Sequence, residues 1–155
     1  NEPIEKNLME IKPRPFTTTF FSLKELSLSI LQGLIITAGL IAIYWFSVEQ
    51  GNNAKVTSAM VFVTLITSNI LLTLVNRSFY YSIIDTLSYR NWLLPLVIIV
   101  TIAMVGLIFV YSPLRQFFGF EQLKASEFFY CITAGFISVI WIEVYKFFKR
   151  VGEAP

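Results

Sequence analysis

Polar side chains recur at helical spacing inside one uncharged run of the sequence, residues 56–76. Asn69, Thr73 and Asn76 are three or four residues apart, so they share one face of a helix. A second stripe, about a third of a turn away, consists of Thr57, Val61, Thr64 and Ser68. Amide and hydroxyl oxygens at this spacing can hydrogen-bond to a neighbouring helix, or they can line the path of a cation.

Asn69 is the most telling of these residues because of its depth. It lies seven residues before the end of the run, which corresponds to roughly 10 Å inside a hydrocarbon core about 30 Å thick. Hydrocarbon cannot solvate an amide, so Asn69 needs a protein or ion partner there. One interpretation is an interhelical hydrogen bond worth around 1 kcal/mol. The other is an oxygen ligand for a transported cation.

The composition indicates the environment that these residues occupy. Hydrophobic side chains make up 55% of the chain and charged side chains 14%, against about 25% charged in soluble domains. Charge is confined to patches that separate long apolar runs, and we predict transmembrane helices at about 26–48, 56–76, 91–113 and 127–147. The predicted fold class is all-α: an integral membrane bundle of four helices (26–147), with a connector (1–25) before it and a tail (148–155) after it.

The distribution of Lys and Arg predicts the orientation of the bundle. With four spans, both ends of the chain and the middle loop (77–90) share one side of the membrane and carry nine of the 12 basic residues. The positive-inside rule therefore places both termini in the cytoplasm. Within the last span, Glu143 and Lys146 are three residues apart and are expected to form an interfacial ion pair; the alternative is a relay for protons or cations.

Several classes of function are excluded by what the sequence lacks. It has no His and one Cys, so it cannot build a His/Cys metal site or a disulfide framework alone. Its net charge of +2 is too small and scattered for nucleic-acid binding. No acid has a nucleophile or second carboxylate at a catalytic spacing; Asp85, Glu121 and Glu127 are expected in solvated loops. We therefore expect no catalytic residue and no bound cofactor in this chain.

Small and polar residues predict how the helices meet. Spans gain little from burying apolar surface against each other, so they associate through close packing and hydrogen bonds. Residues 56–76 carry polar groups on much of their circumference and should be the most enclosed helix, whereas residues 91–113 should face lipid most. The candidate packing residues are Ser68, Thr73 and Asn76 in the second span, and Gly135 and Ser138 in the fourth.

The order of several short motifs resembles one protein family. LMEIKPRP (8–15) resembles the connector after the sixth membrane helix of P-type cation-transporting ATPases, the calcium-pump branch in particular. TSAMVFVTLITSNILLTLVNRS (57–78) resembles the eighth helix of that family, and YRNWLLPLVIIV (89–100) the start of the ninth. YSPLRQFFGFEQL (111–123) is similar to the following outer loop, and WIEVYKFFKR (141–150) to the end of the tenth helix.

The resemblance implies that the chain is the last four of ten membrane helices of a cation pump. Its partners would be the lipid bilayer and the remaining helices and cytoplasmic domains of the parent pump, which would bind ATP and Mg²⁺ and carry the phosphorylated aspartate. The transported ion would be Ca²⁺, and the location the plasma membrane. The family's eighth helix supplies one ion ligand; counting back from Arg77 places Asn69 there, whereas a gap-free alignment places Ile66 there.

Two alternatives to a pump domain remain open from the sequence. The first is a free-standing membrane protein of four helices that acts as an interaction or assembly subunit. The beginning of the chain, with Asn rather than Met and three prolines in its first fifteen residues, is more typical of a piece of a longer polypeptide. The second is a channel subunit, but the sequence has nothing that resembles a selectivity filter.

Overall fold

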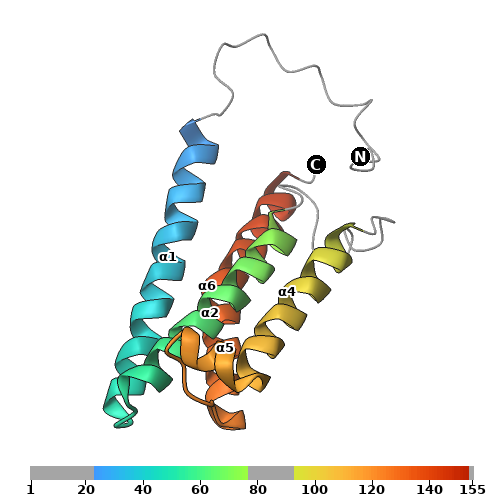
Figure 1. Ribbon diagram of the computed structural model, residues 1–155. Coiled ribbons are helices and arrows are strands. Elements are labelled where there is room, and N and C mark those ends of the chain that lie inside the picture. Colours follow the sequence, from blue (N-terminus) through green and yellow to red (C-terminus); the bar gives the residue numbers. More distant parts are fainter. Residues whose placement is uncertain (1–22, 77–92, 154–155) are drawn as a thin grey trace.

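The computed structural model describes residues 23–76 and 93–153, and these residues are almost entirely helical. The elements are α1 (Leu23–Glu49), α2 (Ala54–Val75), α4 (Leu93–Val110), α5 (Ser112–Phe117) and α6 (Ala125–Glu153). The long helices alternate in direction, so that the ends of α2 and α6 lie at the same end of the molecule as the beginnings of α1 and α4 (Figure 1). Residues 1–22, 77–92 and 154–155 lie outside the described residues, and with them most of the predicted connector (1–25) and all of the predicted loop 77–90, including Asp85.

The helices are apolar and long, as expected for an integral membrane protein. By length and composition α1, α2 and α6 can each cross a bilayer, and α4 contributes a shorter apolar stretch, Pro95–Val110. α1 and α2 are joined by a tight turn in which Gly51 has a φ of +74°, a conformation that favours glycine. Asn53 then caps α2, because its side-chain oxygen accepts a hydrogen bond from the Val56 backbone N–H at 2.9 Å.

α4 ends earlier than the predicted span 91–113. Tyr111 adopts an extended conformation, and Pro113 lies in the first turn of the separate short helix α5. Proline lacks the N–H that would continue the hydrogen bonding of α4, so a new helix starts instead. The Arg115 side chain donates a hydrogen bond to the freed carbonyl of Phe109 at 2.8 Å. α6 is longer than its predicted span 127–147: it begins at Ala125 and continues through Glu153.

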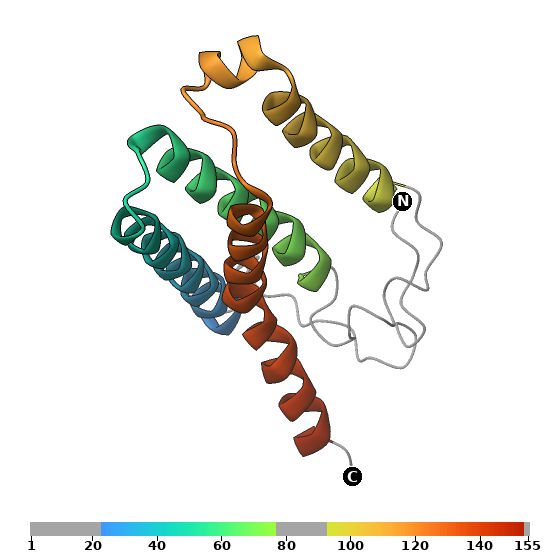
Figure 2. The same ribbon diagram turned by 90° about the horizontal axis from the view of Figure 1, so that it is seen from below.

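α1, α2 and α6 pack against one another pairwise, and α2 contacts both of the other two helices. In the most apolar part of each spanning helix, 33% of residues are buried in α2, against 17% in α1 and 28% in α6. α2 is thus the most enclosed of these three helices, as its polar pattern predicts. The view from below separates α4 from this group along most of its length (Figure 2), and most of its described aliphatic side chains are exposed.

Aromatic rings attach the end of α4 to the rest of the bundle. The ring of Phe109, the one described α4 residue that is buried, lies 6.0 Å from Phe120 and 5.2 Å from Phe128 of α6, measured between centroids. Phe120 also lies 5.0 Å from Phe62 of α2. These rings provide a contact between three helices at one end of the molecule, where aromatic pairs add to the energy of apolar burial.

Glu127 is not the solvated loop residue that its charge predicts. Its side chain is only 8% exposed, and one carboxylate oxygen accepts a hydrogen bond from the Lys124 backbone N–H at 2.7 Å. This is the role of an acid in the first turn of a helix, where it satisfies an unpaired backbone donor. The signal in the sequence was the position of Glu127 just before the apolar run of α6.

Candidate functional site

The side chains of α2 divide into a buried face and an exposed face. Thr57, Thr64 and Ser68 are buried, and the hydroxyls of Thr64 and Ser68 each donate to the carbonyl four residues earlier, at 2.9 Å. Asn69 and Thr73 are exposed on the other face. The Thr73 hydroxyl donates to the Asn69 backbone carbonyl at 2.8 Å, whereas no described residue is hydrogen-bonded to the Asn69 side-chain amide.

The exposed face extends along the whole of α2. Ser58, Phe62, Leu65, Asn69 and Thr73 follow one another at spacings of three or four residues, so they line one side of the helix. Ser58, Asn69 and Thr73 are exposed on this side, whereas Phe62 and Leu65 are half-buried. Ile66, the alternative ligand position, is half-buried beside it. The structure therefore brings Asn69 and Thr73 together on one open face, and it places Ser68 away from them, against another helix.

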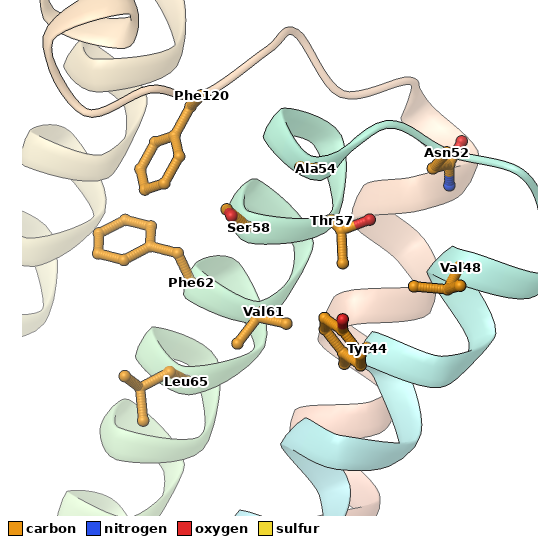
Figure 3. A pocket seen from close by; sticks show the side chains of 10 residues that line it. All are labelled: Tyr44, Val48, Asn52, Ala54, Thr57, Ser58, Val61, Phe62, Leu65 and Phe120. Carbon is orange, nitrogen blue, oxygen red and sulfur yellow. The ribbon is translucent and has the colours of Figure 1, made fainter.

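A groove occupies one end of the exposed face, near the turn between α1 and α2 (Figure 3). It has a volume of about 580 Å³ and is lined mainly by apolar side chains. Figure 3 shows the rings of Phe62 and Phe120 facing each other on one side of the groove and Tyr44 of α1 on the other. Leu65 lines the groove and lies one turn before Asn69, so groove and amide belong to the same open face.

Two glycines let the helices approach closely on the buried side. A Cβ atom on Gly135 of α6 would lie 2.9 Å from the Thr67 side chain and 3.2 Å from the Ser68 backbone nitrogen. A Cβ atom on Gly39 of α1 would overlap the Ser138 hydroxyl of α6. Ser138 is buried, and its hydroxyl donates to the Ala134 carbonyl at 2.8 Å. Small residues at these crossings give the close packing that spanning helices need.

A polar cluster surrounds the C-terminal end of α2. Asn76 and Gln32 of α1 exchange two side-chain hydrogen bonds, of 3.1 and 3.2 Å. On α6, Lys146 donates to the carbonyl of Val75 and forms an ion pair with Glu143 at 3.5 Å. The predicted Glu143–Lys146 pair is thus present. We call Gln32, Asn76, Lys146, Glu143 and the Val75 carbonyl the α2 C-terminal cluster. The hydrogen bond between Lys146 and Val75 could not be predicted from the sequence, because the two residues are 71 positions apart.

The chemistry available to these groups is limited. Among residues 23–76 and 93–153, no three His, Cys, Asp or Glu side chains are close enough together to hold a metal ion. Cys131 is buried and belongs to the apolar core. What the open face offers to a cation is neutral oxygen, from the amide of Asn69 and the hydroxyl of Thr73, and these groups cannot supply the six to eight ligands of a calcium ion. Any ion site would need further ligands from outside the described residues.

Comparison with known families identifies the class of protein. The chain matches the family described as "Cation transporting ATPase, C-terminus" over residues 1–148. It therefore belongs to this family: it is the C-terminal membrane domain of a cation-transporting ATPase, a class that the resemblance of its motifs had predicted. No curated protein matches the chain.

Proposed function

We propose that this domain forms one wall of the ion pathway of an ATP-driven P-type pump and braces the helices that bind the ion. The transported ion in this proposal is Ca²⁺, the pump lies in the plasma membrane, and both termini of the domain are cytoplasmic. ATP and Mg²⁺ are bound by other parts of the parent pump. Asn69 contributes an amide oxygen to the ion or to a group that holds it.

The observation that carries the proposal is the exposure of Asn69 and Thr73 on a helix that is otherwise the most enclosed one. An amide facing lipid at this depth lacks any hydrogen-bonding partner. The open face of α2 therefore needs protein or an ion against it, and helices of the parent pump supply the cover. The groove between Phe62 and Tyr44 extends the same face and provides room for a side of such a helix.

The bracing role is supported by the opposite face of α2. Three kinds of contact fix this helix between α1 and α6: the Ser47–Thr57 hydroxyl pair at 2.9 Å, the close crossing at Gly135, and the α2 C-terminal cluster. A helix held in this way presents its open face at a constant depth and rotation. A mobile ion-binding helix can move against such a surface without displacing it.

The proposal of calcium rests on the motifs that resemble the calcium-pump branch. Asn69 is a neutral ligand and has a shorter side chain than a glutamate. Fewer carboxylates weaken the binding of a hard divalent cation. A pump with Asn69 at this position would accordingly carry one calcium ion where a two-site pump carries two, or would bind its second ion more weakly.

The test is ATP-dependent calcium uptake into vesicles by the full-length parent pump. We expect Asn69→Ala to weaken the apparent calcium affinity tenfold or more, which corresponds to about 1.4 kcal/mol, at wild-type amounts of folded protein. Asn69→Gln keeps the amide and should retain more of the affinity. Thr37→Val is a matched control, because Thr37 is also an exposed polar residue in a span and its hydroxyl bonds only within α1.

The possible outcomes separate the parts of the proposal. Unchanged affinity in Asn69→Ala would remove Asn69 from the ion site. An equal loss in Thr37→Val would show that the effect is not specific to the open face of α2. Absence of calcium uptake by the wild-type pump would exclude calcium as its ion, and the same comparison would then be made with other cations.

A further inference from the structure

Lys146 is an unusual residue for the end of a spanning helix because it is almost completely enclosed. Its side chain is 4% exposed, and that of Glu143 is 13% exposed. Lysines near the end of a span ordinarily extend toward water. Removing an ammonium group from water costs several kcal/mol unless other groups replace its hydration. Its burial therefore indicates that the contacts it makes inside the bundle are strong.

One partner of Lys146 is a backbone carbonyl at the end of a different helix. The last carbonyls of an α-helix have no partner within it, and the C-terminal end carries partial negative charge. Val75 is the last residue of α2, and its carbonyl accepts a hydrogen bond from the Lys146 ammonium. A cation at this position satisfies the carbonyl and interacts favourably with the helix dipole, so Lys146 of α6 acts as a cap for α2.

The opposite side of the same helix end is held by α1. Asn76, the residue after Val75, exchanges two hydrogen bonds with Gln32, whose side chain is 4% exposed. Two amides that bond reciprocally have a defined relative orientation. Contacts from α1 and α6 together restrict both translation of α2 along its axis and rotation about it.

The distance from this helix end to Asn69 is short. Seven residues separate Asn69 from Asn76, which is roughly 10 Å and about two turns of helix. If the last turns of α2 unwind or rotate, the Asn69 amide changes its direction. Contacts that lie outside the set of ion ligands but orient one of them typically affect metal affinity.

We propose that Lys146 is a positioning residue for the ion pathway: by capping α2 at Val75 from α6, it fixes the depth and rotation of the face that presents Asn69. This inference rests on the proposed role of that face. It assigns to α6 an influence on cation affinity that this helix exerts without touching the ion. The effect passes through the backbone of α2.

The test uses the full-length pump and two measurements. Lys146→Met removes the ammonium and keeps a flexible apolar chain, while Lys146→Arg retains a donor. Lys146→Met combined with Glu143→Gln removes both members of the ion pair, and it serves as the second variant if the single one folds poorly. Lys124→Met, at the other end of α6 where the lysine side chain is exposed, is the matched control.

The first measurement is amide hydrogen exchange of residues 69–76, and the second is the apparent cation affinity relative to the maximal rate. We expect faster exchange in Lys146→Met and a roughly tenfold weaker affinity with little change in maximal rate, partial recovery in Lys146→Arg, and no change in Lys124→Met. Unchanged exchange would overturn the inference. Faster exchange with unchanged affinity would also overturn it, leaving Lys146 as a structural cap.

A failure of the proposed function would give a different pattern of results from a failure of the inference about Lys146. If Asn69→Ala left the affinity unchanged while Lys146→Met altered both exchange and affinity, the role of Asn69 would be refuted. The positioning role of Lys146 would be supported in that case, with another group on α2 as the one it orients.

Discussion

Gln32 and Asn76 exchange two side-chain hydrogen bonds across 44 residues of sequence. The Gln32 amide nitrogen donates to the Asn76 oxygen, and the Asn76 nitrogen donates to the Gln32 oxygen. Each amide thus uses both of its functions on the other. Such a pair joins α1 to the end of α2 in one orientation, which a pair of hydroxyls with freely rotating hydrogens would not define.

Removing either amide of this pair should destabilise the bundle by a modest amount. We expect Gln32→Leu and Asn76→Ala each to lower the free energy of unfolding by about 1 kcal/mol. The double variant should lose less than the sum, because the second change removes a group that has already lost its partner. Unfolding by denaturing detergent in mixed micelles measures this difference. Strict additivity of the two changes would show that the hydrogen bonds contribute nothing.

Gly135 should not tolerate even one added methyl group. Gly135→Ala would bring its Cβ to 2.9 Å from Thr67 and close to the α2 backbone, so α6 would have to move away from α2, at a cost of about 1–3 kcal/mol. Gly33→Ala is the control, since nothing lies within 4 Å of the corresponding position. Equal thermal stability of the two variants would contradict the close crossing.

At the Gly39–Ser138 crossing, removing the hydroxyl of Ser138 should compensate for a methyl group added at Gly39. Gly39→Ala should be destabilising by about 1–3 kcal/mol because the new Cβ overlaps the Ser138 hydroxyl. Adding Ser138→Ala removes that hydroxyl and leaves a Cβ–Cβ distance of 3.2 Å, so the double variant should recover much of the loss. The test compares the melting temperatures of Gly39→Ala, the double variant and Ser138→Ala alone. If the double variant were no more stable than Gly39→Ala, a contact other than the Ser138 hydroxyl would cause the loss of stability.

Phe120 should be required for the attachment of α4. Phe120→Ala removes ring contacts with Phe62 and Phe109, and we expect a loss smaller than the roughly 3–5 kcal/mol of a fully buried phenylalanine. Amide hydrogen exchange in residues 118–128 should become faster. Phe117→Ala is the control because Phe117 is 81% exposed. Similar exchange in both variants would argue against the aromatic attachment.

The elements of the bundle were largely predictable from the sequence, because a spanning helix is determined by an uncharged run of sufficient length. The small helix α5 was not predicted. Tyr111 is extended and Pro113 begins a new helix, but in the sequence these residues continue an apolar run that was assigned to one span. Periodicity separated Ser68 from Asn69 and Thr73, but Asn76 of the second stripe bonds to α1, and Val61 of the first stripe lines the groove. Periodicity cannot say which stripe meets the other helices of the same chain, and here Ser68 is buried while Asn69 is exposed.

The α2 C-terminal cluster shows a second limit of sequence analysis. Glu143 and Lys146 were predictable as partners because they are neighbours on one helix. The bond from Lys146 to Val75 joins residues 71 positions apart, and a backbone acceptor has no signature in the sequence. The burial of Glu127 was missed for a related reason: its partner is the backbone N–H of Lys124, which any residue type could provide.

Because α2 packs against both α1 and α6, the contacts of the membrane domain must form in a certain order. α1 and α2 are joined by a short turn, so their contacts can form as soon as both are inserted. The contacts of α2 with α6 close a segment that contains α4, and they must wait until synthesis reaches the last helix. Until then Ser68 and the Val75 carbonyl lack their cover, and the final helix completes the packing of a helix inserted much earlier.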